Sequence, residues 1–192
     1  MQVVIAHSDA ELESFAPESP LSNFLTDMLL NEASNYIKDT TFDNLDLSML
    51  NFGGIRTSMP AGDVTVGDMF AISPFENYLT FILLKGSELK KALSRFNDKF
   101  NAPYAGAIIV YKHNKPVEIT LQGNPIDDNR LYRLVTLNFI SDGGDHILES
   151  IQYEKIEYTT ITFREFLIAE LKAMTARGEK VTGKKDGRAV FK

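Results

Sequence analysis

Two glycine-containing loops carry the side chains of this chain that are best suited to bind a ligand. The first reads NFGGIR at residues 51–56, and the second reads NFISDGGD at residues 138–145. Arg56 offers a planar fork of donors that suits phosphate or carboxylate. Asp145 offers paired acceptors that suit sugar hydroxyls. The Gly-Gly pair in each loop predicts positive φ angles and a close approach of the backbone to a ligand.

An aromatic residue accompanies each loop. Phe75 follows the first loop and Phe139 lies within the second, and two such rings suit stacking on a planar base. Arg56, Asp145 and the two phenylalanines together predict a nucleotide site. Structural alternatives stand beside this interpretation: core packing for the phenylalanines, a solvated or ion-paired Arg56, a turn-capping Asp145, and an Asn51 that stabilises its own loop.

The composition excludes several classes of partner. The chain has 192 residues, 44% of them hydrophobic, and a formal net charge of −6 at pH 7. A hydrophobic share of this size predicts a folded core rather than a disordered chain. Because the acidic balance leaves no basic stripe to neutralise a phosphate backbone, we expect no nucleic-acid polymer as partner. One or two local arginines still suffice for a small anion.

Metal, thiol and membrane chemistry are not expected either. The chain has no cysteine, which removes disulfides and Cys-ligated zinc. Its three histidines, His7, His113 and His146, lie in unrelated segments, so we expect no metal or other cofactor bound by this chain. No apolar run reaches the roughly 18 residues of a membrane span. Residues 1–10 lack the features of a signal peptide, so the chain is either cytoplasmic or has lost a leader.

Hydrophobic periodicity predicts interleaved strands and helices. Helices are expected to begin at Ser19-Pro20, Thr65, Ser87 and Thr162, where capping residues precede apolar positions at helical spacing. Strands are expected at residues 3–6, 45–49, 78–84, 107–111, 117–121, 131–139 and 189–191. Several neighbouring strands have only short turns between them, so the pattern predicts an α/β or α+β layered domain rather than a purely doubly wound one.

Three segments resemble one known family. Residues 18–27 read ESPLSNFLTD, residues 51–93 begin with NFGGIR and contain SPF, and residues 137–146 read LNFISDGGDH. In motif and order they are similar to the C-terminal domain of the 5'-nucleotidase family, over nearly the whole chain. The resemblance implies a single domain over residues 1–192, with the family's layered arrangement of helices flanking a mixed β-sheet core.

The resemblance also implies a function and a set of site residues. In that family the C-terminal domain binds the nucleoside part of the substrate, and a separate N-terminal metallophosphatase domain with two metal ions cleaves the phosphate. Carried over, Asn51 and Arg56 contact the ligand, Phe75 and Phe139 enclose the base, and Asp145 holds the ribose hydroxyls. No catalytic or metal-ligating residue is expected in this chain, and divalent metals are expected only in a partner metallophosphatase domain or subunit. The family is typically periplasmic, secreted or surface-bound.

Two departures from the family pattern leave alternatives open. Phe52 stands where the family motif usually has glycine, and the segment at residues 13–17, ESFAP, has no arginine near Phe15 where many members carry one. A missing ligand-binding cation favours a stand-alone nucleotide-binding module without hydrolase activity, or an interaction domain whose site has decayed. Retention of the other site residues together favours a domain that binds a nucleoside or nucleotide.

Overall fold

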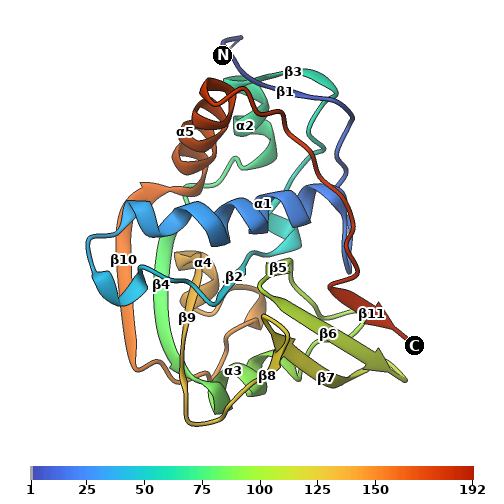
Figure 1. Cartoon of the computed structure of the whole chain (residues 1–192), viewed down its shortest axis with the longest axis vertical. Helices are drawn as coiled ribbons and strands as arrows, with labels where there is room; N and C mark the ends of the chain where they lie inside the picture. Colours follow the sequence, from blue (N-terminus) through green and yellow to red (C-terminus); the bar gives the residue numbers. More distant parts are fainter. Residues whose placement is uncertain (1) are drawn as a thin grey trace.

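A mixed five-stranded β-sheet forms the centre of the computed structural model, which describes residues 2–192 (Figure 1). Its strands lie in the order β10 (Lys155–Thr162), β4 (Tyr78–Lys85), β9 (Leu131–Leu137), β2 (Leu47–Met49) and β5 (Tyr104–Ala105). β2 and β9 run parallel, whereas the other neighbouring pairs run antiparallel. The predicted mixed sheet core is thereby confirmed.

Two smaller sheets complete the described part of the chain. One has four strands in the order β11 (Ala189–Phe191), β6 (Ala107–Lys112), β7 (Lys115–Leu121) and β8 (Asn124–Pro125). The other pairs β1 (Val4–Ser8) with β3 (Gly62–Thr65) in antiparallel fashion. β11, near the C-terminus, pairs in parallel with β6 from the middle of the sequence, which joins the C-terminal segment to the four-stranded sheet.

The α-helices are α1 (Pro20–Glu32), α2 (Val66–Ile72), α3 (Gly86–Leu93), α4 (Asn138–Ser141) and α5 (Phe163–Ala176). Ser19, Thr65 and Thr162 cap α1, α2 and α5 through their side chains, as predicted, and each forms a capping box. The prediction that Ser87 caps α3 is wrong. The N-cap of that helix is Lys85, two residues earlier, and it makes no side-chain cap hydrogen bond.

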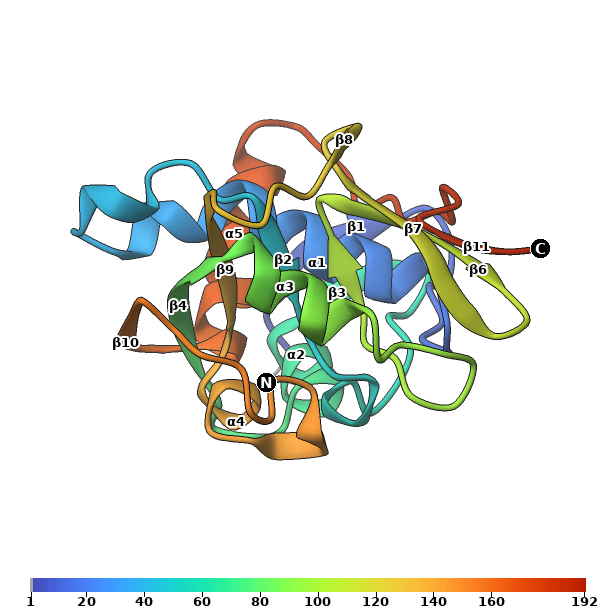
Figure 2. The same cartoon turned by 90° about the horizontal axis from the view of Figure 1, so that it is seen from below.

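The central sheet has a hydrophobic core on each face. Alternate residues of a strand point to opposite faces, so Leu79 and Phe81 of β4 join the core formed with α1, α2 and α5. Ile82 and Leu84 join the second core, formed with α3 and the four-stranded sheet. Figure 2 shows α3 in front of the central sheet, with β6 and β7 beside it. The result is the predicted layered α/β arrangement, with both faces of the sheet covered.

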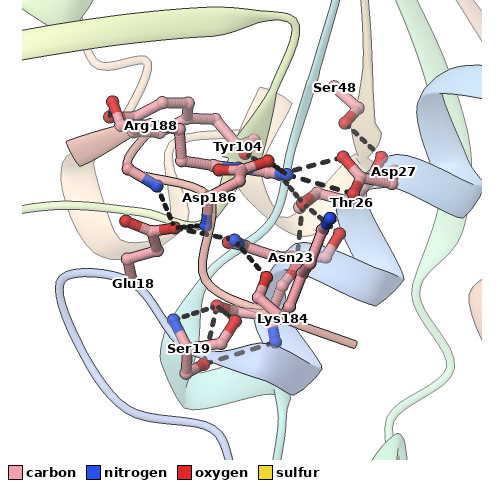
Figure 3. A network of polar contacts seen from close by, with 12 residues as sticks. Glu18, Ser19, Asn23, Thr26, Asp27, Ser48, Tyr104, Lys184, Asp186 and Arg188 are labelled. Carbon is pink, nitrogen blue, oxygen red and sulfur yellow. Dashed lines mark hydrogen bonds and ion pairs between the residues drawn. The ribbon is translucent and has the colours of Figure 1, made fainter. Parts of the chain in front are cut away.

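A buried polar network joins the C-terminal segment to α1 (Figure 3). The Arg188 guanidinium, only 9% exposed, donates to the carboxylates of Asp27 and Asp186 and to the carbonyl of Tyr104. On the other side of the network, Glu18 accepts the backbone N–H of Asp186 at 2.7 Å. The network anchors the residues just before β11 to the helix that crosses the middle of the molecule in Figure 1.

Two further differences from the sequence prediction affect the site. The strand expected to run to residue 139 ends at Leu137, because the chain turns into α4 at Asn138. Strand β10, which the sequence pattern did not reveal, lies at the edge of the central sheet and is half exposed along most of its length. In residues 2–192, none of the helices has both the length and the apolar character needed to cross a membrane.

Candidate functional site

The first glycine loop leaves the central sheet at the end of β2. Asn51 follows this strand and precedes a single 3-10 turn at Phe52–Gly54. Its side chain is buried, with only 6% of the residue exposed. The amide Nδ2 donates to the Asp145 carboxylate at 2.7 Å, whereas Oδ1 is buried without a hydrogen-bond partner among the described residues. The loop therefore contains an unused buried acceptor beside a carboxylate.

The second glycine loop leaves the same sheet at the end of β9. β2 and β9 are parallel neighbours, so their carboxyl ends open on one edge of the sheet, where α/β proteins commonly bind ligands. The hydrogen bond between Asn51 and Asp145 joins the two loops across 94 residues of sequence. The two glycine loops therefore lie on the same side of the molecule.

A cavity of about 180 Å³ lies between the two loops. Its lining residues are Asn51, Gly53, Gly54, Phe75, Asn77, Phe139 and Asp145. Phe75 and Phe139 are 46% and 39% exposed, so neither is a core residue, and the core-packing alternative is wrong for both. Four of the five predicted site residues thus line one cavity.

Two of the four loop glycines, Gly54 and Gly144, are required by close packing rather than by a positive φ angle. Gly53 and Gly54 do not have the predicted positive φ angle. A Cβ on Gly54 would come within 2.7 Å of the Asn51 side-chain oxygen. Of the two glycines in the second loop, only Gly143 has positive φ, at 101°, whereas a Cβ on Gly144 would lie 2.5 Å from both the ring and the carbonyl oxygen of Phe139.

Two tyrosines from outside the second loop support it. The hydroxyl of Tyr153 donates to the carbonyl of Ser141 at 3.2 Å, and burial raises the pKa of Tyr153 to about 12, so it remains a donor at neutral pH. The hydroxyl of Tyr158, on β10, donates to the Asp142 carboxylate at 2.8 Å. This hydrogen bond is the main reason that the pKa of Tyr158 is raised.

Asn77 and Asn138 were not recognised from the sequence. Asn77 lines the cavity, and its carbonyl accepts the backbone N–H of Phe163 at 2.7 Å. The side-chain oxygen of Asn138 accepts the backbone N–H of Tyr78 at 2.8 Å. Asparagine in a loop is too common to single out. The one signal that could have identified these two residues is their position within the motifs SPFEN and LNF.

Arg56 lies beside this cavity rather than among its lining residues. The side chain is exposed, and its Nη1 donates to the carbonyl of Gly53 at 3.3 Å. It lines a neighbouring open hollow together with Phe15. The ammonium of Lys185 lies 5.8 Å from the centre of the Phe15 ring, so a lysine stands close to the place where the sequence lacks an arginine.

Two other features of the described residues bear on which ligands this chain can bind. Among residues 2–192, no group of three or more His, Cys, Asp or Glu side chains is placed to hold a metal ion, and the exposed His146 ring lies 3.4 Å from the Glu149 carboxylate. A larger hollow of about 560 Å³ lies along α1 and α5. It contains none of the loop residues, and its charged side chains are mostly carboxylates, which disfavours an anionic ligand.

Comparison with known proteins identifies the family. The model of the "5'-nucleotidase, C-terminal domain" family matches residues 4–151. Protein UshA of Yersinia enterocolitica is 37% identical over 105 residues, which cover 52% of this chain and 19% of that protein. The trifunctional nucleotide phosphoesterase protein YfkN of Bacillus subtilis is 29% identical over 190 residues, or 89% of this chain and 12% of that protein.

A solved structure agrees over the full chain. The 5'-nucleotidase precursor from Thermus thermophilus superposes with a TM-score of 0.83 and 28% identity, covering 100% of this chain and 40% of that one. The chain therefore spans about a fifth or less of these curated relatives and less than half of the solved structure. The motifs and the comparisons agree, and the chain belongs to the 5'-nucleotidase family, in which it corresponds to the C-terminal domain.

Proposed function

We propose that this chain recognises the nucleoside part of a nucleotide for a 5'-nucleotidase-type phosphohydrolase, with phosphate cleavage carried out by a separate metallophosphatase domain. One observation carries the proposal. Two half-exposed phenylalanines from different loops line one cavity together with the hydrogen-bonded pair of Asn51 and Asp145. A planar base would bury both rings, and base–aromatic stacking contributes about 1–3 kcal/mol per base.

The polar groups of the cavity suit a ribonucleoside. One carboxylate oxygen of Asp145 accepts the Asn51 amide, which orients the carboxylate and leaves acceptor capacity for the ribose hydroxyls. Ligand pockets usually measure roughly 300–1,000 Å³, so the volume of about 180 Å³ suits the ring portion of a ligand whose remainder lies outside.

The remainder of the ligand would reach the neighbouring hollow. Arg56 belongs to the same loop as Gly53 and Gly54. Its exposed guanidinium makes a 3.3 Å hydrogen bond to a backbone carbonyl, and this bond would be broken when the guanidinium turns to a ligand. We assign it to the phosphate end, for which its forked donors are suited. Lys185, near Phe15, supplies a second positive charge on the same side.

The domain and its location follow from the same proposal. Residues 1–192 form one 5'-nucleotidase C-terminal-like domain, and its partner is a metallophosphatase domain, in the same polypeptide or in another, that holds the divalent metals. We place the protein in the periplasm or outside the cell. A relative from Listeria monocytogenes, 25% identical over 91% of this chain, is named a cell wall protein, which supports an extracytoplasmic site.

Calorimetric titration with adenosine, adenine and AMP tests the binding site. Phe75→Ala and Phe139→Ala should each weaken all three ligands by about 1–3 kcal/mol, whereas Asp145→Ala should weaken adenosine more than adenine. Arg56→Ala should matter only for AMP. Phe191→Ala is the matched control, because this phenylalanine is 43% exposed but lies on β11. Equal losses in the control and in the two cavity variants would contradict the site.

Reconstitution separates the hydrolase proposal from the stand-alone module. Purified chain with Mg²⁺, Mn²⁺ or Zn²⁺ should not hydrolyse AMP, and addition of the metallophosphatase domain of a relative should give hydrolysis that depends on Phe75 and Phe139. Nucleoside binding without any such dependence would favour a binding module that takes no part in hydrolysis. Hydrolysis by the purified chain alone would refute the division of labour.

A further inference from the structure

The loop that carries Phe75 is tied to the first turn of α5. Arg164 Nη1 donates to the carbonyl of Ser73 at 3.0 Å and to that of Pro74 at 3.1 Å. Its guanidinium also lies over the ring of Phe70, 4.2 Å from the ring centre. One side chain from a distant part of the sequence therefore contacts both the end of α2 and the two residues immediately before Phe75.

The other end of the loop is held by one backbone–backbone hydrogen bond and by one hydrogen bond to the side chain of Asn138. Phe163, the neighbour of Arg164 on α5, donates its backbone N–H to the carbonyl of Asn77 at 2.7 Å, and Tyr78 donates its N–H to Asn138 at 2.8 Å. Phe75 lies between these two attachments with its ring 46% exposed. Because exposure leaves the ring few packing contacts, its position depends on how firmly the backbone on either side is held.

We propose that Arg164 is a positioning residue that sets nucleoside affinity by holding Phe75 at the cavity. This inference rests on the proposed function of the cavity as a base site. Arg164 lies outside the cavity lining and acts through the backbone of Ser73 and Pro74. A planar guanidinium can donate in its plane while its face covers an aromatic ring, which the compact ammonium of lysine cannot reproduce. Holding a binding loop in its bound conformation improves affinity because less freedom is lost on binding.

The first test measures the mobility of the loop in the absence of any ligand. Hydrogen–deuterium exchange of the full chain should be faster at residues 73–78 in Arg164→Ala than in the unmodified protein, with intermediate exchange in Arg164→Lys. Arg177→Ala is the control, because Arg177 caps the other end of α5 and pairs with Glu179 on the surface. Unchanged exchange at residues 73–78 in Arg164→Ala would refute the positioning role.

The second test is a double-mutant cycle for adenosine binding. Arg164→Ala should weaken binding by about 3- to 10-fold, the range expected for freeing one or two side chains or a short loop, with partial recovery in Arg164→Lys. In the background of Phe75→Ala, the same substitution should have no further effect, since Arg164 acts through that ring. Equal fold-changes in both backgrounds would show that Arg164 is merely structural and overturn the inference.

The two tests separate this inference from the function on which it rests. Absence of adenosine binding by the unmodified chain would refute the base site, while the exchange data would still decide whether Arg164 holds the loop. Adenosine binding with no effect of Arg164→Ala would leave the base site standing and refute the role of Arg164. A melting temperature that falls with unchanged affinity leads to the same conclusion.

Discussion

Replacing Gly144 by alanine tests how the Phe139 side of the cavity is built. A Cβ at this position would lie 2.5 Å from the ring carbon Cε1 and 2.5 Å from the carbonyl oxygen of Phe139. Real Cβ contacts are not this short, so something must shift. The ring is half exposed and can rotate away, whereas the carbonyl belongs to the backbone of α4 and can move only with the helix.

The expected cost is that of inserting a methyl group into a filled space, about 1–3 kcal/mol of unfolding free energy. For a domain of this size that corresponds to a fall in melting temperature of roughly 2–12 °C. Affinity should fall as well, because the ring of Phe139 leaves the position in which it lines the cavity. Loss of one stacked ring weakens nucleoside binding by about 1–3 kcal/mol.

The assay combines thermal melting with calorimetric titration of adenosine. Gly53→Ala is the matched control, since a Cβ there has nothing closer than 3.5 Å and its φ is not positive. We expect the control to leave the melting temperature nearly unchanged; because Gly53 itself lines the cavity, it is a control for stability only. A Gly144→Ala protein that binds adenosine as tightly as the unmodified chain would refute the claim that Phe139 must occupy its observed place.

Two further predictions concern stability. Arg188→Met should lower the unfolding free energy by about 3 kcal/mol, the lower end for breaking a buried ion pair, because Asp27 and Asp186 remain 47% and 44% exposed; urea unfolding measures this, and an unchanged midpoint would contradict it. The ion pair with Lys155, together with hydrogen bonds from Thr41, lowers the pKa of Asp39 from 3.8 to about 2, so this stabilisation is complete above pH 4–5 and is lost as pH falls towards 2. Asp39→Asn should therefore be less stable than the unmodified chain at pH 7, with a gap that narrows by pH 3, and a gap independent of pH would refute stabilisation by the charged Asp39 carboxylate.

Short-range signals were readable because their physics is local. Ser19, Thr65 and Thr162 bond the backbone three residues ahead of them, so the residues themselves reveal the helix starts. The start of α3 was misplaced for the opposite reason. A Cβ at Gly86 would lie 1.9 Å from the carbonyl oxygen of Asp127, and a contact across 41 positions of the chain leaves no local pattern beside Ser87.

The edge strand of the central sheet also could not be predicted from the sequence pattern. Strand β10 pairs with β4, which lies more than 70 residues earlier, and its exposed edge position gives it neither a continuous apolar run nor a clean alternation. Phe139 was expected at the end of a strand, but the chain enters a helical turn one residue before it. Tertiary packing decides both the pairing of β10 and the helical turn at Phe139, because a short segment adopts the conformation in which neighbouring elements can pack against it.

The types of residue in the two glycine loops, and the family motif that contains them, follow from the sequence alone. Which of these residues meet depends on the tertiary structure. Parallel pairing of β2 with β9 brings Asn51 to Asp145 across 94 residues, and the two exposed phenylalanines line the cavity beside them. The tertiary structure also places Arg56 at the neighbouring hollow and brings Arg164 of α5 into hydrogen-bonding distance of the loop that carries Phe75. Motifs record which side chains are present, whereas the packing of distant strands and helices sets the direction in which each one points.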